Sequence, residues 1–366
     1  MSLTIRQIRA GSSQVTVREL PMANMPGRTE LWPSSGEYSV YDAFLYHLMS
    51  NDHTRNQAYQ EAIKVNAPGR SIVDIGTGQD ANWALASVEA GAQRVYAIEE
   101  IEDAYSQAAE KIRRSGLDDR IALFYGSSMR VSLPVQVDVC VSEIIGAIAS
   151  SEGVATVLRD ARERFLKPDG RIIPRRCVTR IAAACLPAEL HVAPGLTAEA
   201  ADYLERVFDQ VGHPFDPRLC ITNFPPECII SNHEIFETLD FTGKNQTEYD
   251  ITASLIIQRR SRLNGFLLWI NLWCADDTEP IDSLVQKTSW TPVFLPIFYP
   301  GVDVGPADRI EAVCRTRISD DGIHPDYEIE GKLLHADGRI ITFDLRVLHH
   351  GHLFRQNSFY RALFPQ

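Results

Sequence analysis

Val73-Asp74-Ile75-Gly76-Thr77-Gly78 is the stretch of this 366-residue chain that decides its fold. A short apolar strand runs into a turn with two glycines, and residues 83–89 have the apolar spacing of a helix. A strand, a loop and a helix in this order are typical of an open parallel sheet that binds a ligand at its carboxyl edge. Gly76 and Gly78 let the backbone approach that ligand, where the following helix presents unpaired N–H groups. We expect Asp80 to cap this helix.

A second predicted strand, residues 94–98, ends in Glu99, 25 residues after Asp74. A carboxylate at this place can accept hydrogen bonds from the two ribose hydroxyls of a nucleoside cofactor. Two families of nucleoside cofactor fit, the dinucleotides and S-adenosylmethionine. Gln79-Asp80-Ala81 follows Gly78 and supplies no third glycine for close packing against a pyrophosphate. The sequence therefore favours S-adenosylmethionine.

Further motifs extend the pattern over most of the chain. They are Asp74 to Gly78, Ala97-Ile98-Glu99, Ser142-Glu143 with Glu152, Phe165-Leu166-Lys167-Pro168-Asp169-Gly170, Ile173-Pro174, the upstream set Met49, Asp52, Arg55 and Tyr59, and Thr288-Ser289-Trp290. In these motifs the chain resembles the protein arginine methyltransferases, a family of class I S-adenosylmethionine-dependent methyltransferases. The resemblance is weak from about 185 to 285.

The resemblance implies an α/β protein in which a Rossmann-like class I methyltransferase domain precedes an antiparallel β-barrel-like domain with an inserted helical dimerisation arm. We expect an N-terminal arm at 1–35, the Rossmann-like domain with its N-terminal helices at 36–175, and the β-barrel-like domain at 176–366, with the helical arm near 195–222. Alternating strands and helices up to Pro174, and period-two apolar runs after it, agree with this division.

Individual elements follow from apolar spacing and turn residues. We expect helices at 41–65, 80–90, 101–115, 152–166 and 198–211, a strand at 14–18 in an otherwise loose arm, antiparallel strands at 176–184, 252–258, 266–273 and 339–347, and a hairpin turn at 335–338. The helix at 198–211 has an apolar face made by Tyr203, Leu204, Val207 and Phe208. By analogy with the family, we expect this face to dock on a second copy and form a homodimer.

Site residues come from the same resemblance. It assigns cofactor contacts to Arg55, Asp74, Gly76, Thr77, Gly78, Glu99, Glu100, Ser128, Met129 and Glu143, and catalytic roles to Glu143, Glu152, Tyr46, Met49 and Trp290. Arg55 matches the arginine that holds the cofactor's carboxylate, although a solvated helix face would also explain it. Glu99 would hold the ribose. Alternatively, it would be one of several acids at the start of the next helix, where the helix dipole stabilises negative charge. Met129 departs from the family's acid at the adenine, so we expect backbone contacts and thioether packing there.

Glu143 and Glu152 are the two acids with a chemical purpose. Together they could hold the flat fork of a guanidinium and concentrate its charge on the reacting nitrogen. Taken alone, Glu152 could instead be an acid in the first helical turn behind an N-cap at Ser150 or Ser151.

Two departures from the family bear on the acceptor. Ser289 stands where the family has a histidine that could pair with Asp52, and residues 146–149 form a smaller and more apolar loop. We therefore expect a small-molecule acceptor, a guanidine nitrogen or an indole-type ring carbon of a specialised metabolite, with Tyr41, Tyr46, Trp290, Phe294 and Phe298 as an aromatic enclosure. Protein arginine N-methylation is the alternative, and a catalytically inactive cofactor-binding module is the alternative of another class.

Composition limits the partners and the compartment. The net charge of −12 and pI near 5.3 argue against a nucleic-acid partner, and the longest apolar run, residues 265–275, is too short to cross a membrane. The seven cysteines are scattered, and residues 1–30 lack a signal-peptide core, so we expect reduced thiols and a cytoplasmic location. His349-His350-Gly351-His352 has no neighbouring acid or cysteine in the sequence, so we expect no metal.

Overall fold

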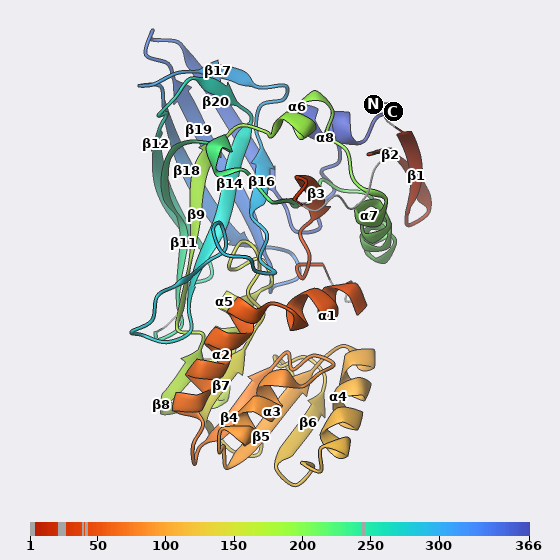
Figure 1. The fold of residues 1–366 in the computed structure, drawn as a ribbon, viewed down its shortest axis with the longest axis vertical. Coiled ribbons are helices and arrows are strands. Elements are labelled where there is room, and N and C mark those ends of the chain that lie inside the picture. Colours follow the sequence, from red (N-terminus) through yellow and green to blue (C-terminus); the bar gives the residue numbers. More distant parts are fainter. Residues whose placement is uncertain (1–3, 21–26, 39, 41–42, 244–245) are drawn as a thin grey trace.

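The computed structural model describes residues 4–20, 27–38, 40, 43–243 and 246–366. A parallel five-stranded sheet forms the lower part of the molecule in Figure 1, and two antiparallel sheets form the upper part. The predicted α/β architecture, a Rossmann-like domain followed by an antiparallel β-barrel-like domain, is confirmed. Among the described residues, no helix is both long and apolar enough to span a bilayer.

The parallel sheet has the strand order β6-β5-β4-β7-β8. The strands are β4 (Ser71–Ile75), β5 (Arg94–Glu99), β6 (Ile121–Tyr125), β7 (Val137–Ser142) and β8 (Leu166–Ile173), with crossover helices α3 (Asn82–Glu89), α4 (Glu102–Arg114) and α5 (Val154–Arg164). β4 and β5 are buried along nearly their whole length, as continuous apolar runs in a parallel sheet should be. The strand order reverses beside β4, where β5 follows on one side and β7 on the other. Such a reversal opens a crevice at the carboxyl ends of the strands.

Helix starts differ from the expectations at three places. The expected helix at 41–65 is two helices, α1 (Ala43–Ser50) and α2 (His53–Asn66). Asp52 is the N-cap of the second, since its side chain accepts from Arg55 N at 2.9 Å. The prediction that Asp80 caps α3 is wrong: Ala81 is the N-cap residue, and Asp80 Oδ1 accepts from Lys111 Nζ at 2.9 Å. Gly153 precedes α5, so neither Ser150 nor Ser151 is its N-cap.

The upper part is built from two antiparallel sheets whose inner faces share one apolar core. The strand order is β11-β9-β14-β16-β10-β3 in one sheet, where β15 also pairs with β14, and β12-β18-β19-β20 in the other. Strands are β3 (Glu30–Pro33), β9 (Arg176–Ala184), β10 (Leu219–Thr222), β11 (Ile229–Asp240), β12 (Tyr249–Ile256), β14 (Gly265–Trp273), β15 (Ile281–Asp282), β16 (Val293–Pro296), β18 (Arg309–Ile318), β19 (Pro325–Leu334) and β20 (Ile340–Val347). Phe266 and Leu268 of the first sheet meet Ile329 and Leu345 of the second in that core.

Smaller elements complete this part. β13 (Ser261–Leu263) pairs with β17 (Val302–Val304), a 3₁₀ turn spans Pro226–Cys228, and α6 (Ala188–Val192), α7 (Ala198–Val211) and α8 (Ser358–Leu363) lie to one side of the sheets. The predicted turn at 335–338 joins β19 and β20, with Gly338 at φ +89°.

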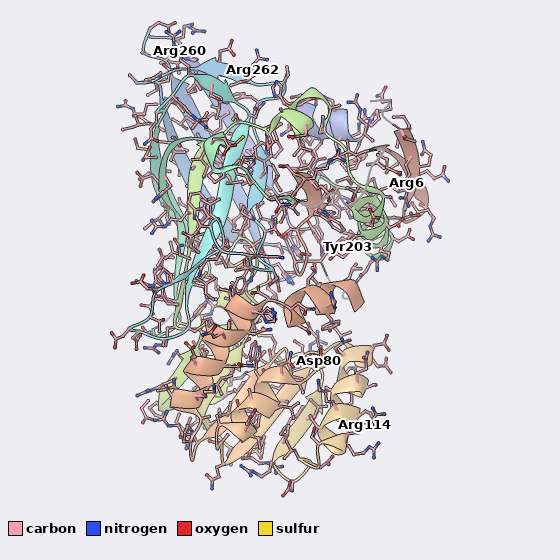
Figure 2. The ribbon with its side chains drawn as sticks, in the orientation of Figure 1. Arg6, Asp80, Arg114, Tyr203, Arg260 and Arg262 are labelled. Atoms are coloured by element: carbon pink, nitrogen blue, oxygen red, sulfur yellow. The ribbon has the colours of Figure 1, made fainter. Side chains whose placement is uncertain are left out.

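The N-terminal segment is a structured hairpin and not the loose arm expected from its composition. β1 (Thr4–Ala10) pairs with β2 (Ser13–Glu19), and the hairpin lies on α7 (Figure 1). Its inward side chains Ile8, Val15 and Val17 belong to the same buried cluster as Leu204 and Phe208 of α7. On the outside, Arg6 pairs with Asp202 and Arg9 Nη2 lies 2.7 Å from Asp209 Oδ2; Figure 2 shows Arg6 beside this helix.

The apolar face of α7 is consequently covered within its own chain. Leu204 and Phe208 are fully buried, and Val207 and Tyr203 are 1% and 3% exposed. The expectation that this face docks on a second copy is therefore wrong, because the hairpin and the β-barrel-like domain already occupy it.

Leu204→Ala should lower the free energy of unfolding by about 2–5 kcal/mol, the cost of a cavity at a buried leucine. Val65→Ala on α2 is the matched control, since Val65 is 76% exposed and its truncation should change little. Denaturant titration of both variants measures the difference. A Leu204→Ala protein with unchanged stability and a smaller assembly in light scattering would instead place this face between two copies.

Candidate active site

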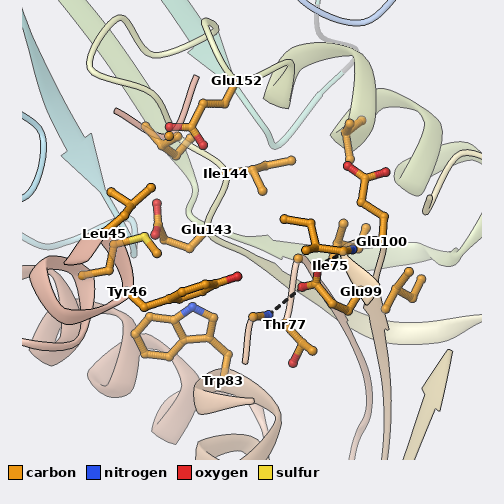
Figure 3. A pocket seen from close by; sticks show the side chains of 18 of the residues that line it. Leu45, Tyr46, Ile75, Thr77, Trp83, Glu99, Glu100, Glu143, Ile144 and Glu152 are labelled. Carbon is orange, nitrogen blue, oxygen red and sulfur yellow. Dashed lines mark hydrogen bonds between the residues drawn. The ribbon is translucent and has the colours of Figure 1, made fainter. Parts of the chain in front are cut away.

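A cavity of about 240 Å³ lies where the carboxyl edge of the parallel sheet meets α1 and the β-barrel-like domain. Figure 3 shows Thr77, Glu99 and Glu143, from the ends of β4, β5 and β7, around it. Its walls are Gly76 to Gln79 after β4, Glu99 to Ile101 at the end of β5, Gly126 to Met129 after β6, Glu143 to Ile145 after β7, Leu45, Tyr46, Met49 and Arg55 from α1 and α2, Glu152, and Ser289, Trp290, Ile323 and His324 from the second domain. Parallel strands end at one edge, which is why residues so far apart in sequence converge here.

The glycine turn and Glu99 form one unit. Gly76 and Gly78 have φ values of +71° and +66°, a conformation that other residues rarely adopt. Glu99 Oε2 accepts from Gly78 N at 2.8 Å, and its Oε1 accepts from Ile101 N at 2.9 Å (Figure 3). Burial raises the pKa of Glu99, and these backbone hydrogen bonds oppose the rise. A carboxylate has lone pairs for about four hydrogen bonds, so Glu99 retains capacity for a ligand's hydroxyls.

Asp74 is not part of the cavity wall, unlike the other predicted cofactor contacts. It is fully buried, and its Oδ2 accepts from the Thr77 hydroxyl at 2.5 Å. Burial raises the pKa of Asp74 to about 7, against the effect of the Thr77 hydrogen bond. Asp74 therefore stabilises the glycine turn through Thr77 and does not contact a ligand bound in the cavity.

Asp74 should make stability depend on pH in a defined direction. Its folded-state pKa lies above its unfolded value, so the stability it contributes is full below about pH 4 and is lost as pH rises through 7. The side chain of Asp74→Asn stays neutral at every pH. Between pH 4 and 8 the variant's free energy of unfolding, measured by denaturant titration, should rise relative to that of the wild type by up to about 4 kcal/mol.

Asp138→Asn is the control of opposite sign for this titration. Although burial raises the pKa of Asp138, hydrogen bonds from Lys167 and Ser71 lower it to about 2. That carboxylate contributes stability above its unfolded pKa and loses it as pH falls toward 2. A difference between Asp74→Asn and the wild type that does not grow with pH would contradict the buried, proton-binding state of Asp74.

Arg55 and Glu143 form a buried ion pair at the wall. Arg55 Nη1 lies 2.5 Å from Glu143 Oε2, and its Nη2 donates to Met49 O at 2.6 Å. The two side chains are 5% and 8% exposed. Burial raises the pKa of Glu143, and the charge of Arg55 opposes it. The guanidinium is thus fixed beside the cavity, in a place suited to a ligand's carboxylate.

Glu152 enters the same cavity from the segment before α5 (Figure 3). The backbone of Gly36 lies against its carboxylate: a Cβ at Gly36 would stand 2.3 Å from Glu152 Oε1, and Gly36 has φ +88°. The N-terminal segment therefore closes over this end of the cavity. Sequence reasoning did not assign Gly36 to the site, although the turn formers Pro33-Ser34-Ser35-Gly36 mark the bend.

Gly36→Ala should displace the Glu152 carboxylate and lower turnover on the order of tenfold or more, because small misplacements at a reacting centre are costly. Cofactor affinity should stay within a factor of about three, since the turn and Glu99 are untouched. Gly338→Ala is the matched control, with φ +89° and no atom within 4 Å of its Cβ, in the turn between β19 and β20. Equal loss in both variants would indicate backbone strain alone.

The loop between the two glutamates is anchored at both ends. Trp290 Nε1 donates to Ile145 O at 2.6 Å, so the predicted catalytic tryptophan holds the backbone next to Glu143. Glu237 of β11 accepts from Ser150 N at 3.0 Å and from the Ser150 hydroxyl at 2.6 Å. It is fully buried and also accepts from Thr179 and Tyr249. Glu237 was not predicted, since no local motif marks it.

Ser289 lies beside Asp52, as the resemblance implied for the family's histidine. Asp52 Oδ2 accepts from Ser289 N at 2.6 Å and from its hydroxyl at 2.9 Å. A hydroxyl cannot take up a proton near neutral pH as an imidazole can. Ser289 therefore pairs with Asp52 but cannot relay a proton as an imidazole at this position could.

The predicted aromatic enclosure is only partly present. Tyr46 crosses the cavity between Glu143 and Glu99, and burial together with the charges of Glu99 and Asp80 raises its pKa (Figure 3). Phe294 and Phe298 do not line the cavity: Phe294 is fully buried against Phe359, and Phe298 packs on Phe343. Tyr41 lies outside the described residues.

Trp83, which we did not predict, lines the cavity and stacks on Tyr59 at 4.9 Å. Its position at the start of α3 was the available signal.

The remaining predicted contacts lie along the floor. Glu100 and Ser128 line the cavity, and the Ser128 carbonyl accepts from Arg164. Met129 packs against the core of the parallel sheet. Among loop residues 146–149, Ala147 and Ile148 are buried in the β-barrel-like core and none lines the cavity. The inference that this loop reshapes an acceptor pocket is therefore wrong.

Relatives of this chain were found by sequence. It is 32% identical over 259 residues to the probable protein arginine N-methyltransferase 6 of Arabidopsis thaliana, covering 67% of this chain and 57% of that protein. It is 35% identical over 143 residues to protein arginine N-methyltransferase PRMT10 of the same plant, covering 38% and 37%. The chain thus spans from about a third to little more than half of the length of these curated relatives. No family model matches it.

Solved structures agree on the fold. Arabidopsis thaliana protein arginine methyltransferase 10 superposes with a TM-score of 0.68 at 19% identity, covering 84% of this chain and 97% of that one. The Trypanosoma brucei PRMT1 enzyme–prozyme heterotetrameric complex with AdoHcy gives a TM-score of 0.64 at 16% identity, covering 83% and 98%. At these identities the likeness is one of fold.

Proposed function

Starting from the fact that its relatives in sequence and in structure are protein arginine methyltransferases, we propose that this chain is an S-adenosylmethionine-dependent methyltransferase that acts on a guanidinium group. The observation that supports it most is that two glutamates, Glu143 and Glu152, line one cavity. The same cavity contains the glycine turn and Glu99, a buried acid that could accept from ribose hydroxyls. The small-molecule acceptor favoured by the sequence has less support, because its loop argument does not hold.

The residues at the cofactor end fit S-adenosylmethionine in kind and in place. Glu99 offers acceptors for ribose hydroxyls, and Arg55 offers a cation for the carboxylate. Gly76 and Gly78 supply a turn at positive φ, in which a Cβ at Gly76 would stand only 3.1 Å from Ile144 Cγ2. Bound there, S-adenosylmethionine would supply an electrophilic methyl group.

The acceptor end is set by the paired acids. A guanidinium is a weak nucleophile because its lone pairs are delocalised. Glu143 and Glu152 can hold its fork in register and favour localisation of electron density on one nitrogen. Trp290 and Glu237 hold the loop between the two glutamates in place, and α1 and the segment around Gly36 form another wall of the cavity.

A second cavity, of about 460 Å³, adjoins the first and shares Ser35, Leu45 and Ser289 with it. Its other walls include Trp32, Tyr203 and Thr222. It provides room for the body of an acceptor whose guanidinium enters between the glutamates. This space is compatible with a peptide or with a compact molecule.

The acceptor class is tested with labelled S-adenosylmethionine and a panel of arginine-containing peptides, free arginine and indole compounds. We expect label on guanidine nitrogens and none on indole carbon. Label on indole alone would support the small-molecule alternative, for which Ser289 in place of the family's histidine is the favouring feature. Cofactor binding without transfer to any acceptor would support the inactive cofactor-binding module.

A homodimer remains part of the proposal by analogy with the family that the sequence resembles; the Trypanosoma brucei structure shows assembly of another kind, a heterotetramer. The homodimer contact would use a surface other than the apolar face of α7, which the N-terminal hairpin covers. Light scattering at micromolar concentration tests it, and a monomer there would refute it.

A further inference from the structure

A cluster of two histidines and an aspartate lies at the Glu152 end of the cavity. Asp321 and His324 belong to the turn between β18 and β19, and His349 follows β20. A carboxylate oxygen of Asp321 and one ring nitrogen of each histidine lie within 4.8 Å of one another. Ile323 and His324 line the same cavity as Glu152. The turn rests on the start of α5: Thr156 donates to Ile323 O at 3.2 Å, and a Cβ at Gly153 would stand 2.5 Å from Ile323.

Asp321 and His324 form an oriented pair. Asp321 Oδ2 lies 2.5 Å from His324 Nδ1, while its Oδ1 accepts from the backbone N–H groups of Ile323 and His324 at 2.8 and 2.9 Å. Burial acts to raise the pKa of Asp321, but these hydrogen bonds lower it overall, so the carboxylate stays charged. Because Nδ1 is hydrogen-bonded to the carboxylate, Nε2 is the ring nitrogen available to a methyl-accepting substrate in the cavity.

The geometry speaks against a metal ion as the purpose of the cluster. The rings of His324 and His349 stack in parallel, with centroids 4.1 Å apart and planes 6° apart. Their in-plane lone pairs therefore run side by side and do not converge on one point, as ligands of one ion must. His349 Nδ1 instead lies 3.5 Å from Glu37, which is paired with the buried Arg218.

Acidic groups lie around His324 and around the ring stacked on it. Asp321 on its own turn is anionic, and Glu37 lies behind the stacked His349. Glu152 lines the same cavity. Burial lowers the pKa of His349, and burial with the neighbouring His349 lowers that of His350 to about 4, so neither competes as a cation near neutral pH.

We propose that His324, oriented by Asp321, accepts the proton that the acceptor nitrogen loses on methylation. This inference rests on the proposed function and assigns the base that Ser289 cannot supply. The nitrogen–methyl bond forms as the carbon–sulfur bond breaks, the electron pair of that bond stays on sulfur, and the excess proton on nitrogen passes to His324 Nε2. The side chain of His324 is 24% exposed, so the proton can then leave to solvent.

His324→Gln should lower kcat on the order of a hundredfold, the usual contribution of a positioned base. The KM for the acceptor and the cofactor affinity should change little. The wild-type kcat should fall at acid pH with a slope of one, and the variant should lose that limb. His352→Gln is the matched control, because His352 is exposed, lies against the ring of His213 and does not line the cavity. It should keep both the rate and the limb.

Chemical rescue separates a base from a structural role. His324→Ala should regain activity as imidazole is added, with a rescued rate that rises with the pH-dependent fraction of neutral imidazole. A variant whose kcat stays within about threefold of wild type, or a loss that imidazole does not restore, overturns the proposal. Loss of wild-type activity on chelation and its return with zinc also overturn it, in favour of a metal. Failure of the proposed function would appear separately, as no turnover by the wild type.

Discussion

Glu143→Gln and Glu152→Gln should each lower kcat/KM for a guanidine acceptor on the order of a hundredfold or more. Each substitution leaves one side of a buried cation without its carboxylate, and a hydrogen bond to a charged group contributes about 1.5–3 kcal/mol. Steady-state kinetics with the acceptor identified from the panel measures the loss.

Glu143 needs a second measurement, because it is also the ion-pair partner of Arg55. Calorimetry with S-adenosylmethionine shows how much of the Glu143→Gln effect comes from the cofactor. Glu163→Gln, an exposed acid on α5, is the matched control and should be neutral. If one of the two substitutions lowers kcat/KM strongly and the other only mildly, the acceptor offers a single N–H, as an indole does. If neither loses as much as about tenfold, the paired-acid account is wrong.

Glu99→Ala should weaken S-adenosylmethionine binding by about 1.5–3 kcal/mol, equivalent to a tenfold to 150-fold rise in Kd. The reason is the loss of a buried, charged acceptor for the ribose hydroxyls. Titration calorimetry on the folded protein measures it.

Glu99 also accepts from Gly78 N and Ile101 N, so its removal could loosen the turn. Glu99→Gln keeps the side chain's shape and one acceptor oxygen, and should lose less affinity than Glu99→Ala. Glu102→Ala, an exposed acid in the first turn of α4, is the control. Unchanged affinity in a folded Glu99→Ala protein would remove the ribose role.

Local pattern was sufficient for much of the fold. α7 and β9 begin and end where their apolar periodicity predicts, because each is long and has one clear buried face. The glycine turn and Glu99 were readable for a similar reason: ligand chemistry constrains residue types at short spacing. Asp80 failed as a cap because its partner, Lys111, belongs to the next helix.

What the sequence did not predict depends on contacts between distant segments. The hairpin of residues 4–19 covers α7 nearly two hundred residues later, so an apolar helical face looked like a subunit interface. Glu237 reaches Ser150, and Asp321 with His324 meets His349, only through the register of the antiparallel sheets. Period-two patterns give each strand's inner face but not its neighbours.

A crystal structure with S-adenosylhomocysteine tests the central claim most directly, that this cavity holds the cofactor with its reactive end toward the paired acids. We predict the ribose hydroxyls on Glu99, the amino acid carboxylate at Arg55, and the sulfur facing the space between Glu143 and Glu152. A nucleoside bound elsewhere, or a sulfur turned away from both glutamates, would contradict the account.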